Sequence, residues 1–511
     1  MENTVKKVLI LGGGSAGWLT AGIIAAEHGP ALDITLVESP DVPTIGVGEG
    51  TWPSMRETLR KIGVSESSFI RECDASYKQG SKFIGWKSGE QSDYYYHPFS
   101  LPHGFFEVNC VPAWQAQSSK LSFADVVSAQ PLVCEQGLAP KQFNTPDYAA
   151  VANYAYHLDA AKFGAFLQRH CTKSLGVKHV LDHVTEVVES VDGYIDSLRT
   201  MRHGNLDADL FIDCSGGASI LLGKHYQEPF VSRQSVLFND RALAVQVPYA
   251  DPDQPISSVT LSTAQRAGWI WDIGLPTRRG VGYVYSSAHS SDAQAEEDLR
   301  TYLTPDVGKK KAESAEFRKL KINPGHRASF WRKNCVAVGM SAGFIEPLEA
   351  SALALVELSA AMIRDSMPAN RSLMALAERR FNERFQYRWD RVIDFLKLHY
   401  VLSQRQDSSY WHDHRLESTI PERVQELLAL WRYQSPSRLD FMQTEEIFTA
   451  ASYQYVLYGM GFEANNMTVN RRSNDVGVAE RYMKENQVQT QRLLRGLPSN
   501  RDLLNMIRQP A

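Results

Sequence analysis

The hydrophobic positions near the N-terminus form short, unbroken runs. The apolar run at residues 8–11 leads into the glycines of residues 12–17, and an Ala-, Leu- and Ile-rich segment follows at residues 18–27. A short continuous apolar run predicts a strand buried on both faces, and the longer segment predicts a helix. A second apolar run at residues 33–38 completes a strand–helix–strand unit, which predicts a parallel sheet.

The pattern changes along the rest of the chain. Apolar and polar residues alternate over residues 236–290, which predicts an antiparallel sheet. Helical periodicity is expected over most of residues 51–87 and again from about residue 368 onward, and strands are expected at 178–188, 197–201 and 210–213. We therefore expect an α/β fold with α+β elements. A discontinuous Rossmann-like domain would span residues 1–370, with substrate-facing insertions at about 90–150 and 231–320, and a mostly helical region would span 371–511.

The glycine-rich turn matches the pattern G-x-G-x-x-G. Gly12 permits the tight turn, Gly14 lets a pyrophosphate approach the backbone, and Gly17 lets the helix pack on the strand. The amides of Ser15 and Ala16 begin the helix, where unpaired N–H groups and the positive dipole end favour phosphate. Glu38 ends the second strand, where a carboxylate can accept the ribose hydroxyls. The turn therefore predicts a dinucleotide site.

A second segment indicates which dinucleotide binds. Residues 208–217 read as an apolar strand that ends in Asp213 and a turn of small residues, Cys214 to Gly217. This is typical of FAD domains that close back over the cofactor. The G-x-G-x-x-G pattern occurs once, so no separate NAD(P)H domain is expected. The electrons, or the reduced flavin itself, would then come from another protein.

Composition and charge narrow the function. The formal net charge of −4 argues against a broad surface for nucleic acid or anionic membranes. The sequence contains no run of about 18 apolar residues, so no membrane span is predicted and we expect a cytoplasmic protein. The six widely spaced cysteines suggest neither a disulfide framework nor a zinc site, and residues 412–414 (HDH) are expected to be a solvated loop rather than metal ligands.

Four motifs together resemble the flavin-dependent halogenases of the tryptophan-halogenase type. They are residues 12–18 (GGGSAGW), residues 44–52 (TIGVGEGTW), residues 268–273 (GWIWDI) and residues 344–351 (FIEPLEAS). The third resembles the family signature W-x-W-x-I-P, although Gly274 stands at the proline position. The fourth departs as well, because Ala350, Ser351 and Ala352 replace the usual Ser-Thr-Gly after the acid.

The resemblance implies a role for particular residues. Lys78 would be the catalytic lysine, with Lys82 as the alternative, and Glu349 would be the catalytic acid. The backbone amides of Ser351 and Ala352 would hold the halide. The further implied contacts are Gly12, Gly14, Ser15, Ala16, Gly17, Glu38, Val47, Gly48, Val184 and Gly339 for FAD, His97, Phe99 and Phe448 for the substrate, and Trp269 and Trp271 as the tryptophan motif.

The implied reaction uses reduced FAD from a separate flavin reductase, O2 and chloride or bromide to make hypohalous acid, which halogenates a small electron-rich aromatic. The tyrosine and acid cluster that holds free tryptophan is not evident at residues 436–446, so indole or an indole derivative is the expected substrate. An FAD-dependent aromatic monooxygenase, either hydroxylase or epoxidase, is the alternative, and a non-catalytic flavin sensor is a third. The protein is expected to be a monomer or a homodimer.

Overall fold

The computed structural model describes residues 4–42, 48–90, 92–117, 121–443, 446–464 and 475–509. The chain divides into two compact units, each made of three separate stretches. Unit 1 comprises residues 1–75, 158–234 and 323–390, and unit 2 comprises residues 76–157, 235–322 and 391–511. Most of both expected insertions falls in unit 2. The boundaries at 157/158 and 390/391 lie within the strand β7 (Ala155–Asp159) and the helix α11 (Met374–Val401).

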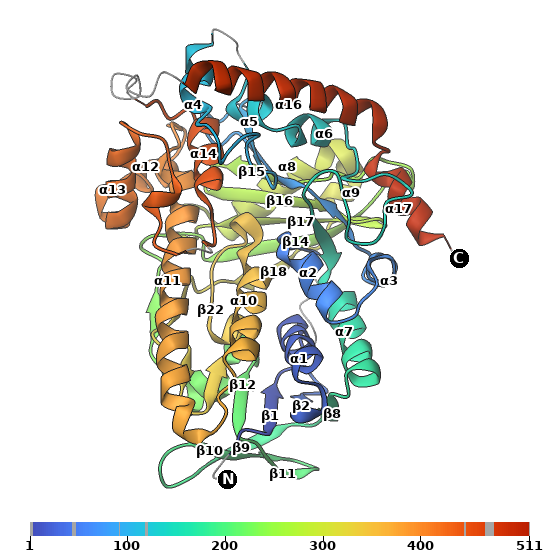
Figure 1. The fold of residues 1–511 in the computed structure, drawn as a ribbon, viewed down its shortest axis with the longest axis vertical. Helices are drawn as coiled ribbons and strands as arrows, with labels where there is room; N and C mark the ends of the chain where they lie inside the picture. Colours follow the sequence, from blue (N-terminus) through green and yellow to red (C-terminus); the bar gives the residue numbers. More distant parts are fainter. Residues whose placement is uncertain are drawn as a thin grey trace. The chain divides into compact units, whose positions relative to one another are not determined.

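A six-stranded sheet forms the centre of unit 1, in the order β20-β21-β12-β1-β2-β8. Every neighbouring pair is parallel except β20 with β21. The first helix, α1 (Ser15–His28), packs against α7 (Ala160–Ser174) and α10 (Ser351–Asp365), beside this sheet (Figure 1). The strands and helices are β1 (Lys7–Leu11), α1 (Ser15–His28), β2 (Asp33–Glu38), β3 (Gly48–Gly50), α2 (Ser54–Lys61), α3 (Glu66–Glu72), α7 (Ala160–Ser174), β8 (Lys178–Leu181), β9 (Val184–Glu189), β10 (Ile195–Thr200), β11 (Gly204–Asp207), β12 (Leu210–Asp213), β13 (Phe230–Ser232), β19 (Gly325–Arg327), β20 (Trp331–Arg332), β21 (Cys335–Ala337), β22 (Gly343–Phe344) and α10 (Ser351–Asp365).

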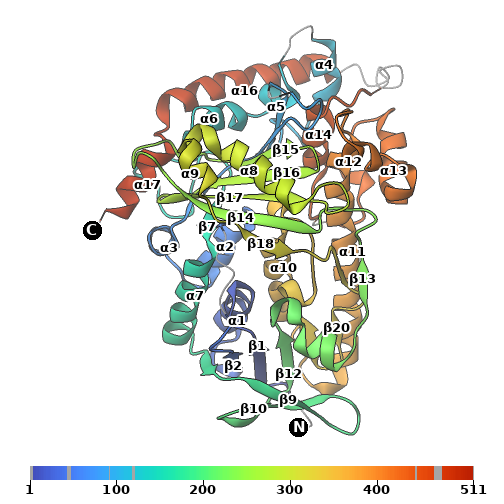
Figure 2. The ribbon, with the colours of Figure 1, turned by 180° about the vertical axis from the view of Figure 1, so that it is seen from behind.

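A seven-stranded sheet forms the centre of unit 2, in the order β18-β14-β17-β16-β15-β5-β6. Only β15 and β5 pair in parallel. Helix α8 covers one face through a core of buried Leu, Val, Tyr and Ala side chains (Figure 2). The strands and helices are β4 (Ser76–Lys78), β5 (Gly80–Ile84), β6 (Tyr94–Pro98), α4 (Val111–Ala116), α5 (Phe123–Val127), α6 (Gln130–Glu135), β14 (Arg241–Pro248), β15 (Thr260–Gln265), β16 (Gly268–Gly274), β17 (Arg278–Tyr285), α8 (Asp292–Val307), α9 (Lys309–Glu313), β18 (Arg318–Lys321), α12 (Ser409–Asp413), α13 (Glu422–Trp431), α14 (Ala450–Gly459), α16 (Val476–Gly496) and α17 (Asn500–Arg508).

The expected fold class is confirmed, with three local corrections. Residues 51–87 are not mostly helical, because the chain turns into β4 and β5 after α3. The strand expected at 178–188 is two strands, β8 and β9, which belong to different sheets. Residues 412–414 are not a solvated loop, since His414 is fully buried and contacts the Lys397 ammonium at 3.0 Å. Within the described ranges, no helix is long and apolar enough to cross a membrane.

Candidate functional site

The glycine turn between β1 and α1 has the shape that the sequence predicts. Gly12 has φ +118°, and a Cβ there would lie 2.2 Å from the carbonyl oxygen of Cys214. A Cβ on Gly17 would lie 1.9 Å from the Gly12 oxygen, so the helix could not pack as it does. A Cβ on Gly14, in contrast, would meet no atom within 4 Å. The backbone is therefore accessible at the glycine where a pyrophosphate would approach.

The N-terminal end of α1 has no side-chain cap of its own. Gly14 caps the helix without a side-chain hydrogen bond, and the first turn carries no acidic residue. The first amides of a helix have no partner inside the helix, so they are suited to phosphate oxygens. Gly339 approaches the same turn, because a Cβ there would lie 2.9 Å from the Ala16 Cβ. These residues fit the pyrophosphate of a dinucleotide.

Glu38 reaches over the glycine turn from the end of β2. A Cβ on Gly13 would lie 1.5 Å from its Oε2, so a side chain there would displace the Glu38 carboxylate from this position. Its Oε1 lies 2.7 Å from His179 Nε2, and Gln168 Nε2 lies 3.3 Å from the other ring nitrogen of His179. The His179–Glu38 contact is short but poorly aligned as a hydrogen bond. Burial raises the pKa of Glu38, while His179 opposes that shift.

Two other expected FAD contacts, Gly48 and Val184, begin β3 and β9 and are half-buried. Val47 lies outside the described residues. Sequence reasoning did not single out Asp213 as an organising residue. Its fully buried carboxylate accepts the amides of Leu221 and Leu222 at 2.8 and 2.9 Å. It also accepts the Ser341 hydroxyl at 3.1 Å and thus fixes the turn after β12.

The acid of the FIEPLEAS motif lies in a strained turn. Glu349 (φ 62°) and Ala350 (φ 55°) both have left-handed backbone conformations, which are rare for residues other than glycine. Glu349 is 7% exposed. Helix α10 starts immediately after the turn, at Ser351, and has no side-chain cap and no acidic residue in its first turn. Ser351 is buried and Ala352 is exposed, and their amides are the first two of the helix.

Lys78 is buried, with only 1% of its surface exposed. It lies on β4, and its ammonium is 5.4 Å from the centre of the Phe99 ring. The paired strand β7 brings His157 opposite Ser76, two residues before Lys78. Burial and the charge of Lys78 lower the pKa of His157 well below its usual value. The alternative, Lys82, is engaged elsewhere, because it forms an ion pair with Glu135 at 2.5 Å.

Aromatic rings gather around the remaining expected substrate residues. The His97 ring is 5.7 Å from Phe395 and 6.2 Å from Tyr455. Phe448 is buried and stacks on Phe395 with ring centres 3.8 Å apart. Phe99 is half-buried. The structure thus brings His97 and Phe448 to one aromatic cluster through Phe395, which the sequence did not single out because it sits in an ordinary helical pattern.

The tryptophan pair lies on β16, where Trp269 and Trp271 are buried with ring centres 6.4 Å apart. Trp271 fits because a glycine, Gly282, stands on the adjacent strand, and a Cβ there would lie 2.0 Å from the indole. Gly274, which replaces the family proline, accepts the Ser76 hydroxyl at 2.5 Å through its carbonyl. The end of the tryptophan strand is therefore bonded to the strand that carries Lys78.

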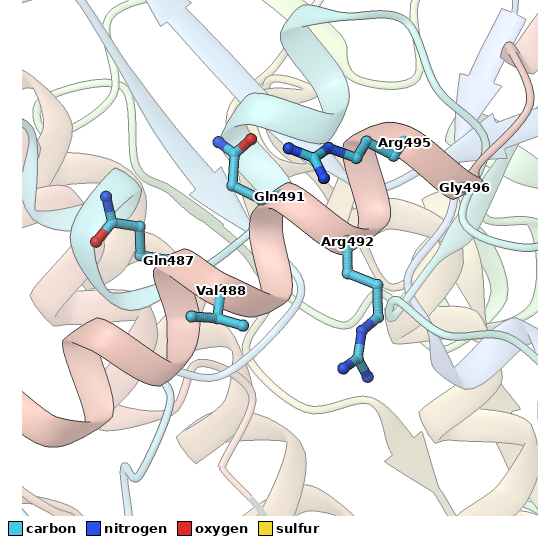
Figure 3. A pocket seen from close by; sticks show the side chains of 6 residues that line it. All are labelled: Gln487, Val488, Gln491, Arg492, Arg495 and Gly496. Atoms are coloured by element: carbon cyan, nitrogen blue, oxygen red, sulfur yellow. The ribbon is translucent and has the colours of Figure 1, made fainter.

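A shallow surface pocket of about 550 Å³ lies on α16. The residues that line it are Gln487, Val488, Gln491, Arg492, Arg495 and Gly496 (Figure 3). None of these side chains is aromatic, and none is an expected site residue. In the described part of the chain, no group of three or more His, Cys, Asp or Glu side chains could hold a metal ion.

Comparison with known proteins identifies the family. The model of the family described as "tryptophan halogenase" matches residues 7–473. The chain belongs to the tryptophan halogenase family. It is 32% identical to the tryptophan 7-halogenase RebH of Lentzea aerocolonigenes over 450 residues, covering 84% of this chain and 83% of that protein.

Solved structures agree with this assignment. The tryptophan halogenase from Shewanella frigidimarina superposes with a TM-score of 0.96 and is 53% identical, covering 99% of this chain and 98% of that one. Tar14, a tryptophan C-6 flavin-dependent halogenase from taromycin biosynthesis, has a TM-score of 0.91 and 32% identity, covering 99% of this chain and all of that one.

Membership in the tryptophan halogenase family confirms three expectations from the sequence: the family resemblance, the α/β fold and an enzyme of the flavin-dependent halogenase class. The alternative of an aromatic hydroxylase is not favoured. The family also implies FAD and a halide, and the glycine turn and the start of α10 have geometries that fit these two groups.

Proposed function

We propose that this halogenase acts on indole or an indole derivative that lacks a free amino-acid end. The support comes from residues 436–443 and Glu446, whose polar groups bond to one another and to neighbouring side chains; Glu445 lies outside the described residues. The Asp440 carboxylate accepts the Ser437 amide at 2.7 Å and the Trp431 indole N–H at 3.0 Å. Gln454 donates to the Pro436 carbonyl at 2.9 Å. Asp440, the only carboxylate of residues 436–443, thus caps the turn at Ser437, and we propose that it does not bind the ammonium group of free tryptophan.

Lys78 is the proposed catalytic lysine. The support is the motif at residues 76–83 that resembles the family's lysine segment, together with the buried position of Lys78 beside the Phe99 ring. Beside the Phe99 ring, its neutral amine can take the halogen from hypohalous acid, forming an N–halogen bond as the O–halogen bond breaks and water leaves, or its charged form can hold the acid by a hydrogen bond. Either way an electrophilic halogen is presented to an aromatic ring. The aromatic cluster of His97, Phe395 and Phe448 is the proposed wall for that ring, since flat π-systems pack well against one another.

Glu349 is the proposed acid that stabilises the positive charge on the halogenated ring and accepts its proton. The amides of Ser351 and Ala352 are the proposed halide ligands. An uncapped helix start presents N–H groups without intrahelical partners at the positive end of the helix dipole, which is favourable for an anion. A backbone site of this kind does not depend on the family's Ser-Thr-Gly side chains.

FAD is the proposed cofactor, held at its pyrophosphate by the glycine turn and at its ribose by Glu38. Ser15, Ala16, Gly48, Val184 and Gly339 are the other proposed contacts. When bound in reduced form, FAD would supply two of the four electrons that reduce O2, and the halide would supply the other two, so that one oxygen atom leaves as water and the other ends in hypohalous acid. A separate flavin reductase is the proposed source of the reduced cofactor.

The test is an incubation of the protein with FAD, a flavin reductase, NADH, O2 and bromide, followed by mass spectrometry. Indole and free tryptophan are supplied in parallel at equal concentration. The expected product is monobrominated indole, formed with a kcat/KM at least about tenfold above that for tryptophan, a difference of about 1.4 kcal/mol in the barrier. A hydroxylated product without bromine would refute the halogenase function, and faster turnover of tryptophan would refute only the substrate assignment.

A further inference from the structure

The peptide group between Glu349 and Ala350 is fixed at both ends. Its N–H, from Ala350, donates to the Pro347 carbonyl at 2.9 Å. Its carbonyl oxygen, from Glu349, accepts the indole N–H of Trp52 at 2.7 Å. This peptide plane sets the left-handed conformation on either side of it. Left-handed residues other than glycine persist only where the surroundings hold them.

The segment that carries Trp52 is attached to α10 at a second level. Ser54 and Thr58, on α2, donate to the two carboxylate oxygens of Glu357 at 3.1 and 2.5 Å. Glu357 lies on α10 and is only 4% exposed. The helices α2 and α10 pack against each other (Figure 1). Trp52 thus contacts the strained turn from a segment that leads directly into α2, a helix bonded to α10.

We propose that Trp52 is a positioning residue for halide binding. Its indole N–H holds the Glu349–Ala350 peptide, and this peptide aims the first two amides of α10, those of Ser351 and Ala352. The inference rests on the proposed halide site. A halide is bound by N–H groups that must converge on one point, so a small rotation of the preceding peptide weakens binding. Tryptophan suits this role because its N–H is a donor only.

The test replaces Trp52 by Phe, which keeps an aromatic ring and removes the donor. The matched control is Trp331→Phe. Like Trp52, Trp331 belongs to unit 1 and donates its indole N–H to a backbone carbonyl, that of Lys333, at 2.8 Å. Trp331 is 1% exposed. Two quantities are measured for each variant: the KM for bromide at saturating indole, and the rise in melting temperature of the apoprotein as bromide replaces sulfate at constant ionic strength.

The expected result for Trp52→Phe is an approximately fivefold rise in the bromide KM, as for the loss of one ordinary hydrogen bond. The bromide-dependent rise in melting temperature should shrink in parallel, while the KM for indole stays within about twofold of the wild-type value. Trp331→Phe should leave both bromide readouts unchanged. Trp52→His retains a ring N–H and should fall between wild type and Trp52→Phe.

Three outcomes overturn the inference. They are a bromide KM for Trp52→Phe within twofold of wild type, an equal rise in Trp331→Phe, or a Trp52→His variant no better than Trp52→Phe. If Trp52→Phe does not fold, the comparison of Trp52→His with wild type decides by the same bromide readouts. A wild-type protein that incorporates no bromide would instead refute the proposed function, so the two failures are distinguishable.

Discussion

At the scale of single residues, burial distinguishes the two candidate lysines. Lys78 is 1% exposed beside an aromatic ring, whereas Lys82 is neutralised by Glu135 and lies 4.2 Å above the ring of Tyr94. We expect Lys78→Ala to lower kcat for bromination by at least about a hundredfold, the usual effect of losing a positioned catalytic group. FAD affinity, measured by fluorescence quenching, should be unchanged. Lys82→Ala should stay within a few-fold of wild type, and the reverse order would contradict the assignment.

The raised pKa of the buried Glu357 carboxyl predicts that the free energy of unfolding depends on pH. Its burial on α10 raises its pKa to about 7, although Thr58 and Ser54 donate to it. Because the folded-state pKa lies above the unfolded value, this carboxyl stabilises the fold below pH of about 4.5 and loses that contribution as pH rises through about 7, on the order of 3 kcal/mol in all. Glu357→Gln should therefore flatten the unfolding free energy between pH 5 and 7 in urea titrations. An unchanged slope would show that another group is responsible.

At the scale of elements, two glycines of the β1–α1 turn are expected to affect different properties, Gly12 the stability of the fold and Gly14 the binding of FAD. Gly12→Ala places a Cβ 2.2 Å from a backbone oxygen at φ +118°, so we expect a clear loss of stability by thermal unfolding. Gly14→Ala meets no protein atom within 4 Å and has an ordinary φ of −74°, so the apoprotein should melt within a few degrees of wild type. It should nevertheless bind FAD about tenfold more weakly or worse, because the methyl group occupies the approach of the pyrophosphate. Unchanged FAD affinity in Gly14→Ala would place the pyrophosphate elsewhere.

Elements governed by local pattern could be predicted from the sequence, and those governed by distant partners could not. The runs at β1 and β2 are buried on both faces, so the pattern alone identified them. Residues 76–84 read as a continuation of helix, yet β4 pairs with β7 and β5 with β15, partners about 80 and 180 residues away. His414 looked solvated because nothing nearby in sequence indicates that the Phe238 and Tyr400 rings stack on it at 4.0 and 4.1 Å.

The same distinction applies to the candidate site. Its glycines could be predicted, because the glycine motif directly encodes the backbone geometry of the turn. Phe395, Trp52 and Glu357 carry no such signal, because a phenylalanine in a helix, a tryptophan before a proline and a glutamate in a helix are all common. Their roles depend on contacts that only the fold creates, such as the 2.7 Å bond from Trp52 to the Glu349 carbonyl.

At the scale of the whole molecule, the proposed residues are divided between the two units. The glycine turn, Glu38 and Glu349 belong to unit 1, whereas Lys78 and the tryptophan pair belong to unit 2. Both units are assembled from alternating stretches of the chain, so neither corresponds to one half of the sequence. Motifs spread over residues 12 to 351 are the expected result, since each unit collects its residues from separate stretches of the chain.

The whole chain also predicts how electrons are supplied. The dinucleotide turn occurs once in the sequence, so one site serves FAD and no second site is evident for a nicotinamide cofactor. If reduced FAD arrives by diffusion, no particular reductase is required. We expect bromination of indole to proceed with FAD reduced by light and EDTA, with no reductase protein present. Its rate per reduced FAD supplied should match that with two unrelated flavin reductases.

Two controls separate enzymatic bromination from chemistry in solution. Catalase removes hydrogen peroxide, so product that persists does not come from peroxide released by free flavin. Lys78→Ala under the same illumination should give only the background, because uncaptured hypohalous acid would be the sole remaining halogenating agent. If reduced FAD arrives by diffusion, its source makes no difference to the halogenase. Product formed with one reductase but not with light would therefore contradict diffusion. It would indicate that this halogenase must contact the reductase.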